Sequence, residues 1–154
     1  MTGKGEFKNE RSMEMAKSYL KRAYNKISEA REHLKHFNYS ESISASQECI
    51  ELSIKSVFLV LQEEYPKRHE FKEEEFENIL KKIPDNFEYL NFPQLYFYSK
   101  FWLSFYTTAK YGLEILGIGA DKLFEKEEAE LALKHAQKCE SAARILKDYI
   151  EYPY

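Results

Sequence analysis

The sequence predicts an all-α protein with an antiparallel helical bundle as its core, built from four long helices and one additional short helix. Three observations lead to this prediction. Apolar residues recur at alternating steps of three and four along much of the chain, which places them on one stripe of a helix. Short turns containing Asn, Pro or Gly separate the segments that carry this pattern. No stretch of useful length alternates apolar and polar residues as a half-buried strand does, so helices must supply the core.

The clearest pattern predicts a long first helix from Met13 to about Phe37. Asn38 tolerates a left-handed conformation that would end this helix, and Ser40 can cap the next one. The second helix should run from about Glu41 to Glu64, with an apolar surface wide enough for a central helix. Pro66 should end it, because proline lacks an amide hydrogen and restricts the residue before it.

A short helix is expected over about Glu73–Lys82, followed by a loop over residues 85–92. Pro93 can then occupy the first turn of a helix over about Gln94–Leu116, where its missing donor costs little. Aromatic side chains point in almost every direction around this helix. It is therefore either central to the bundle or packed with its outer face against another subunit.

The stretch "GIGAD" predicts the end of that helix, because Gly117 and Gly119 favour a break in the chain. Asp121 can cap a last helix that reaches about Tyr149. A phosphate-binding loop is a poorer interpretation of the two glycines, since no strand precedes them and the lysine of that motif is missing.

Length and composition indicate one domain. The chain has 154 residues, of which 44% are hydrophobic and 32% charged, enough for a sizeable core. We expect a single helical domain over residues 13–150, preceded by a disordered or frayed segment over residues 1–12. The formal net charge of -3 argues against a general nucleic-acid coat but allows a local basic patch.

Several kinds of site and location lack support in the sequence. Apolar runs stay short of the roughly 18 residues that span a bilayer, and no apolar core of a secretory signal is visible, so we expect a soluble, cytoplasmic protein. Cys49 and Cys139 lie in helical patterns without metal-ligand spacing, which predicts two free, buried thiols. The histidines form no metal motif, so we predict no metal and no cofactor. No pattern pairs a nucleophile with a base, so we assign no catalytic residue.

One stretch carries a family resemblance. Residues 36–62, "HFNYSESISASQECIELSIKSVFLVLQ", place Gln47, Glu51 and Lys55 at steps of four on the second helix, after an aromatic and polar turn. The later stretches "RHEF" and "TTAKYGLEIL", and the alanine-rich stripe of the last helix, follow in an order that resembles the HEPN family of small helical domains. The resemblance covers about residues 13–150, nearly the whole chain.

The resemblance implies an antiparallel up-and-down four-helix bundle with one additional short helix, which forms a homodimer. Such proteins work beside a minimal nucleotidyltransferase, in some members as a toxin–antitoxin pair, and nucleotide binding has been proposed for the group. Ribonuclease members carry Arg, four to six residues and then His late in the bundle, where two subunits join to cut RNA without metal. In this chain Lys110 matches that Arg, and residues 114–117 contain no His. Lysine lacks the two-pronged geometry of arginine, and no general base accompanies it. We therefore expect a non-catalytic interaction module that binds a partner and a nucleotide or RNA.

The alternative is a metal-independent ribonuclease with an atypical site that uses Lys110, Tyr111, Arg144 or a histidine. The hexapeptide "REHLKH", residues 31–36, has the Arg-to-His spacing of such a site, but it ends the first helix instead of lying late in the bundle. We interpret it as a positively charged helix end, which the helix dipole favours.

Six residues are candidates for binding a ligand or partner: Glu51, Lys55, Arg68, His69, Lys110 and Tyr111. The first two either line a groove between helices or form a pair that braces the bundle. Arg68 and His69 either form a polyanion-binding corner or cap the short helix. Lys110 and Tyr111 either bind a ligand or form a surface salt bridge and a packed ring. Trp102 either stacks on a base or packs in the core or a dimer interface.

Overall fold

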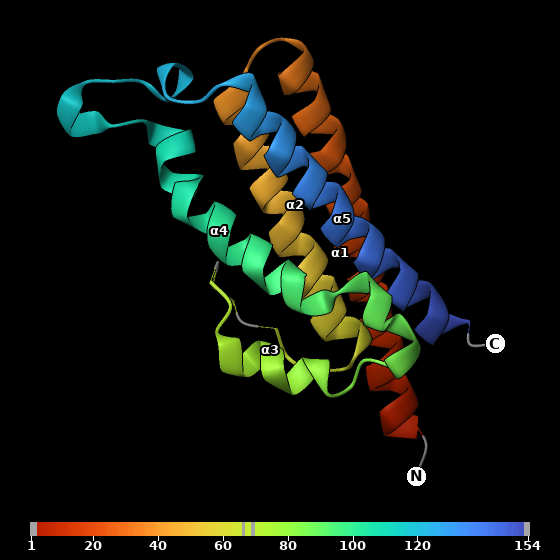
Figure 1. Ribbon diagram of the computed structural model, residues 1–154. Coiled ribbons are helices and arrows are strands. Elements are labelled where there is room, and N and C mark those ends of the chain that lie inside the picture. Colours follow the sequence, from red (N-terminus) through yellow and green to blue (C-terminus); the bar gives the residue numbers. More distant parts are fainter. Residues whose placement is uncertain (1–2, 66, 69, 153–154) are drawn as a thin grey trace.

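The computed structural model of the protein describes residues 3–65, 67–68 and 70–152, with side chains described from residue 10 onward. Within these ranges the chain forms four long helices and one short helix (Figure 1). The long helices are α1 (Gly3–Lys35), α2 (Tyr39–Val60), α4 (Phe92–Tyr111) and α5 (Lys126–Glu151), and the short helix is α3 (Glu73–Leu80). No described residue lies in a strand, and the predicted all-α helical bundle is confirmed.

Helix α2 is the central helix that its wide apolar surface predicted. It is buried along nearly its whole length, between α1, α4 and α5 (Figure 1). Small residues let α1 approach it closely. Ser42 Oγ donates to the carbonyl oxygen of Ala30 at 2.8 Å, and Ser56 Oγ donates to that of Ala16 at 3.3 Å. These two buried hydroxyl groups thus have backbone acceptors in the neighbouring helix, and the order of the pairs makes α1 and α2 antiparallel.

Both helices of this hairpin end on a non-glycine residue in the left-handed conformation. At the end of α1, Phe37 has φ 64°, and the amide of Asn38 donates back into the last turn at 2.8 Å. At the end of α2, Gln62 has φ 61°, and the amide of Glu63 makes the equivalent bond, also at 2.8 Å. Each end is a Schellman motif, in which a six-to-one hydrogen bond closes the helix.

Three predictions about these ends are wrong. Phe37 takes the left-handed conformation, whereas Asn38 immediately precedes α2. Ser40 lies inside α2, where its hydroxyl donates to a neighbouring carboxylate instead of capping the helix. Helix α2 also ends at Val60, well before Pro66, which lies outside the described residues. The Schellman motif closes the helix before a proline is needed to stop it.

The chain between α2 and α4 adds short elements to one side of the bundle. α3 begins where predicted, and its Phe76 packs on Tyr96 of α4 with ring centroids 5.4 Å apart. The segment predicted as a loop contains a 3₁₀ helix, η1 (Asp85–Leu90). Asn91 follows with φ 53°, and Pro93 occupies the first turn of α4, as predicted.

Helix α4 ends at Tyr111, earlier than predicted, because Gly112 takes φ 74° in the left-handed region. Residues 112–118 then form a loop that projects from the bundle (Figure 1), and we call this loop the finger. The backbones of Leu113 and Ile118 pair across its base through hydrogen bonds of 2.8 and 3.1 Å. Its tip is a 3₁₀ turn, η2 (Glu114–Leu116).

The finger leads through another 3₁₀ turn, η3 (Ala120–Lys122), into α5. Asp121 lies within η3 and does not cap α5, contrary to the prediction, and Glu125 precedes the helix instead. The chain therefore breaks at Gly117 and Gly119 in two consecutive 3₁₀ turns. Asp121 belongs to the second turn, so it is not available to cap α5.

Two predictions from composition can be compared with the structure. Cys49 and Cys139 are both free and buried, as predicted. Burial raises the pKa of Cys49 to about 12 and that of Cys139 well above its ordinary value, so both thiols stay protonated. In the described ranges, no helix combines the length and the apolar character that crossing a membrane requires.

Candidate functional site

One face of α4 carries a row of exposed aromatic rings. Phe97, Phe101 and Phe105 follow at steps of four on one stripe, and neighbouring ring centroids are 6.1 and 5.3 Å apart. Phe97 is 59% exposed. The opposite face, with Leu95 and Trp102, is buried in the core. The aromatic residues of α4 therefore form two surfaces, one inside the bundle and one facing outward.

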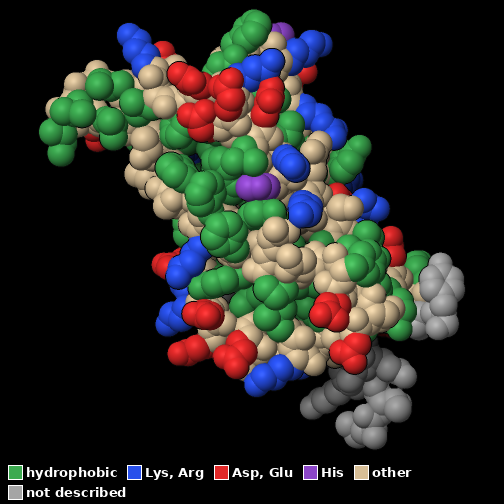
Figure 2. Space-filling model, viewed as in Figure 1, with side chains coloured by type: hydrophobic (Ala, Val, Ile, Leu, Met, Phe, Trp, Pro, Cys, Tyr) green, Lys and Arg blue, Asp and Glu red, His purple; other side chains and the backbone are tan. Residues whose placement is uncertain are grey.

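The finger carries a second set of exposed apolar side chains. Ile115 is 101% exposed and Leu116 67%, and Tyr111 and Leu113 are exposed beside them. Figure 2 shows hydrophobic side chains over the projecting finger and over part of α4. We call the whole set the α4 surface: Phe97, Phe101, Phe105, Tyr111, Leu113, Ile115 and Leu116. Soluble monomers rarely expose apolar patches beyond a few hundred Å², so this surface indicates an interaction site.

Lys110, at the last turn of α4, already has partners. Its Nζ donates to the hydroxyl of Tyr106 at 3.2 Å and lies 5.4 Å from the centroid of the same ring. This hydrogen bond raises the pKa of Lys110 above its ordinary value, so the ammonium stays charged. Tyr106 donates to Glu48 Oε1 at 3.4 Å, and Lys26 pairs with Glu48 Oε2 at 2.9 Å. A continuous series of polar contacts thus connects α4 with α2 and α2 with α1.

A cavity of about 550 Å³ lies beside Lys110, between α1, α2, the end of α4 and η3. Its charged lining consists of four carboxylates, one ammonium group and an imidazole, from Glu29, Glu41, Glu48, Asp121, Lys110 and His33. Lys26 pairs with two of these carboxylates, yet the carboxylates still outnumber the ammonium groups. The lining is therefore negative at neutral pH and repels a phosphate group.

The cavity changes the interpretation of the hexapeptide "REHLKH". His33 lines the cavity together with Lys110, although the two residues are far apart in the sequence. Arg31 and His36, the pair with the ribonuclease spacing, do not line it, and His36 Nε2 lies 2.8 Å from Glu32 Oε1 instead. Arg31 and His36 thus lie outside the cavity, whereas His33, between them in the sequence, lines it.

Sequence reasoning missed the acidic lining. A signal existed on α2, where Ser40, Ser44 and Glu48 follow at steps of four and form a polar row along one face of the helix. Glu29 and Asp121 gave no signal, because α1 and η3 bring them to the cavity from distant parts of the chain.

Tyr111 belongs to the α4 surface and is exposed, with its ring centroid 5.9 Å from Lys110 Nζ. Residues 114–117, where the ribonuclease pattern would place a histidine, form the tip of the finger. Lys110 and Tyr111, which match the family segment, therefore lie at two different sites. Lys110 lies at the cavity, and Tyr111 lies beside the finger, in a hollow that Thr107 and residues 112–116 also line.

Glu51 and Lys55 form an ion pair on α2. Lys55 Nζ donates to Glu51 Oε1 at 2.8 Å, and both side chains are mostly buried. The same Nζ lies 5.5 Å from the ring centroid of Tyr65, whose hydroxyl is 2.7 Å from that of Tyr19 on α1. This geometry fits the bracing alternative, because the pair connects α2 with α1 and with the segment after α2.

Arg68 pairs with Glu75 in the first turn of α3. Glu75 Oε1 also accepts a hydrogen bond of 2.9 Å from the backbone amide of Lys72, just before the helix. Arg68 thus ties the preceding segment to the start of α3, next to the acidic Glu73 and Glu74, a setting that does not suit a polyanion. His69, the other candidate at this corner, lies outside the described residues.

Trp102 is 2% exposed and joins α4 to α5. Its Nε1 donates to Nδ1 of His135 at 2.9 Å, and Tyr98 stacks on the same imidazole with centroids 3.7 Å apart. Burial, and after it the charges of Lys134 and Lys138, lower the pKa of His135 below its ordinary value. Trp102 therefore packs in the core, and its partner imidazole stays neutral so that Nδ1 can accept.

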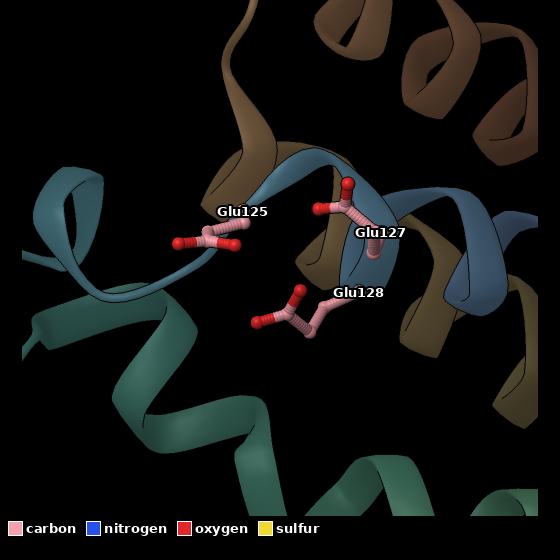
Figure 3. A group of neighbouring side chains, drawn as sticks. All are labelled: Glu125, Glu127 and Glu128. Carbon is pink, nitrogen blue, oxygen red and sulfur yellow. The ribbon is translucent and has the colours of Figure 1, made fainter.

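An acidic cluster lies where α5 begins (Figure 3). Glu125, Glu127 and Glu128 are, among the described residues, the one group of His, Cys or acidic side chains close enough together to share a metal ion. All three stand at the surface within the first turn of α5 or just before it. The helix dipole stabilises negative charge at this end, which accounts for the cluster without an ion.

Comparison with protein families gives one match. The model of the HEPN domain matches residues 16–146, a range that includes most of the bundle and both Lys110 and the cavity. The chain therefore belongs to the HEPN domain family, a family that includes ribonucleases, and the resemblance seen in the sequence is confirmed. Comparisons with curated proteins and with solved structures found no match.

Proposed function

We propose that the protein is a non-catalytic interaction module that forms a homodimer through the α4 surface and binds a minimal nucleotidyltransferase. One observation carries the proposal, the apolar surface that the α4 stripe and the finger expose together. Keeping large apolar side chains in water costs free energy, and covering them with another protein surface removes that cost. The nucleotidyltransferase is proposed because of the family to which the chain belongs.

Three features support a role without catalysis. Lys110 stands at the arginine position, but its ammonium is bonded to Tyr106. The cavity beside it is lined by four carboxylates, which repel the phosphate that the residue would have to hold. Residues 114–117 provide no histidine that could act as acid or base.

Sedimentation velocity over a wide concentration range tests the dimer. The wild-type chain should sediment as a dimer, and Phe101→Asp should sediment as a monomer because a carboxylate cannot be buried at an apolar contact. Tyr24→Asp is the matched control, since Tyr24 is an exposed aromatic residue on α1, outside the α4 surface. A wild-type chain that is monomeric at every concentration would contradict the proposal.

Co-purification tests the partner. The untagged chain should elute with a tagged minimal nucleotidyltransferase from the same genome when the two are co-expressed, at a fixed ratio and in high salt. A contact that does not depend on exposed charges survives salt that screens them, so co-elution in high salt excludes non-specific ionic binding. Failure of the two proteins to elute together would remove the nucleotidyltransferase from the proposal.

A metal-independent ribonuclease is the second candidate, because His33 and Lys110 line the same cavity. An imidazole and an ammonium group are the types of side chain that such a reaction needs. The test is cleavage of a panel of small RNAs in EDTA. We expect no cleavage above background, whereas cleavage that both Lys110→Ala and His33→Ala abolish would establish the ribonuclease.

A nucleotide or RNA segment is a further ligand in the proposal, and Lys134 and Lys138 on α5 suit it better than the acidic cavity. The charges of both lysines act on His135, and Figure 2 shows a histidine with two basic side chains next to it on this face. A ligand that binds only the folded state raises the melting temperature. ATP or a short RNA should therefore stabilise the wild-type chain more than Lys134→Glu/Lys138→Glu, and no shift with either ligand would remove this part of the proposal.

A further inference from the structure

We propose that the finger is a dimerisation arm that docks on the α4 stripe of a second copy of the chain, near Phe97 of the partner subunit. The inference rests on the dimer proposed above and specifies how its two subunits hold each other. Ile115 and Leu116 at the tip of the finger are the side chains that make the contact.

The finger is built to hold these side chains in place before any contact. The Leu113–Ile118 backbone pairing closes its base, and Gly112 and Gly117 make its turns with φ 74° and 66°. The fit at Gly112 is tight, since a Cβ there would lie 2.4 Å from the carbonyl oxygen of Ile118. A preorganised loop loses less conformational entropy when it binds, so its apolar tip suits an interface.

The area of the α4 surface matches what a stable dimer needs. At roughly 150–250 Å² for a large side chain, its exposed fractions amount to about 700 Å² of apolar surface per subunit. A specific interface of standard size buries about 800 Å² on each partner. The α4 stripe alone provides about a third of the estimated area, so a dimer of this size requires the finger as well.

The position of the finger determines its partner. It follows directly from the C-terminal end of α4, whereas Phe97, the most exposed ring of the stripe, lies near the other end. A two-fold axis near Phe101 and Phe105 pairs the two α4 helices in antiparallel directions. Each finger then reaches the Phe97 end of the opposite helix, and the contact forms twice, as two-fold symmetry requires.

Cross-linking between two variants tests this contact. Cys49 and Cys139 are fully buried, so a cysteine introduced at the surface is the reactive thiol. Ile115→Cys protein mixed with Phe97→Cys protein should give a covalent dimer with a short bismaleimide, and each variant alone should give little. Ile115→Cys mixed with Tyr24→Cys is the matched control and should give none.

Equilibrium sedimentation of Ile115→Asp/Leu116→Asp provides the second measurement. The dimer dissociation constant should rise roughly tenfold or more, as loss of a buried apolar anchor does, while the helical circular dichroism stays that of the wild type. An unchanged dissociation constant together with no selective cross-link would overturn the arm, and dissociation by Phe101→Asp would show that the proposed dimer still stands. A finger variant that keeps the dimer but loses the nucleotidyltransferase would also overturn it, by assigning the finger to that partner. A monomeric wild type would instead refute the proposed dimer itself.

Discussion

Lys110 shows how the contacts of a single residue limit the chemistry of a site. It occupies the position of an arginine in the family pattern, but the hydroxyl of Tyr106 accepts from its ammonium group and Glu48 lies one contact further. The residue therefore links α4 to α2 while its charge faces a negative cavity. Lys110 thus keeps the positive charge of the arginine in the family pattern. Its contacts, however, connect two helices and do not hold a phosphate group.

His135 gives a prediction on pH dependence. Its pKa is lowered in the folded protein, chiefly by burial, so the folded state binds the proton less readily than the unfolded chain. The stability it confers is complete above the unfolded pKa near 6.5 and falls as the pH drops below that value. Urea unfolding at pH 7.5 and 5.5 should show a smaller loss of stability for His135→Gln than for the wild type.

The exposed His36 serves as the control for this measurement, because it lies on the surface of the α1 end, away from the core. His36→Gln should keep the pH dependence of the wild type. An identical pH dependence for wild type and His135→Gln would contradict the assignment.

Each element ends for a local reason that is only partly visible in the sequence. The helical stripes, the central place of α2 and the position of Pro93 follow from residue spacing, and these predictions are confirmed. The residues that close α1 and α2 were missed because Phe37 and Gln62, which have no known left-handed preference, complete the Schellman motifs. The end of α4 was missed because Gly112 and Gly117 both fit a break, and only the pairing of Leu113 with Ile118 makes Gly112 the first turn.

The two glycines of the finger should differ in their tolerance of a side chain. Gly112→Ala forces a Cβ against the Ile118 carbonyl, whereas a Cβ at Gly117 meets nothing within 4 Å. Gly117→Ala should therefore lower the free energy of unfolding only because alanine disfavours the left-handed conformation, by about 1 kcal/mol. Gly112→Ala should also break the pairing at the base of the finger. Amide hydrogen exchange should show loss of protection at Leu113 and Ile118 in Gly112→Ala alone, and equal protection in both variants would contradict this account.

The contact between α1 and α2 should not tolerate a larger side chain. Ala23 is fully buried in the core on the face of α1 that also carries Ala16 and Ala30. Ala23→Leu adds volume where the helices are already close and should cost about 1–3 kcal/mol in urea unfolding. The neighbouring Tyr24 is exposed, so Tyr24→Leu should change the free energy of unfolding by no more than about 0.5 kcal/mol. Equal stability of the two variants would show that α1 can shift outward.

At the scale of the molecule, the sequence predicted the bundle better than the site. A bundle depends on patterns within each helix, and those patterns can be read along the chain. The cavity depends on Glu29, Glu48, Lys110 and Asp121 meeting from four elements, and no local pattern records that meeting. The α4 surface was predicted only in part. The excess of aromatic residues indicated an apolar outer face on α4, but the projection of the finger depends on backbone conformation.

The two buried thiols should report on the opening of the whole bundle. Cys49 on α2 and Cys139 on α5 are fully buried, and their raised pKa values keep them protonated. Iodoacetamide should leave the native protein unmodified and add two groups once urea unfolds it, as mass spectrometry can count. Modification of one thiol well below the unfolding midpoint would show that α2 or α5 opens separately from the rest.

The seam between α4 and α5 contains the only tryptophan of the sequence, hydrogen-bonded to an imidazole. The protein thus has a single indole fluorophore, whose emission can be excited apart from that of the tyrosines. It lies on the inner face of α4, the helix whose outer face is proposed to meet a second subunit. Its emission should be blue-shifted in the folded chain and should shift to red if α4 detaches from α5. A partner that merely covers α4 should leave the spectrum unchanged, so one optical measurement can distinguish docking on this helix from displacement of it.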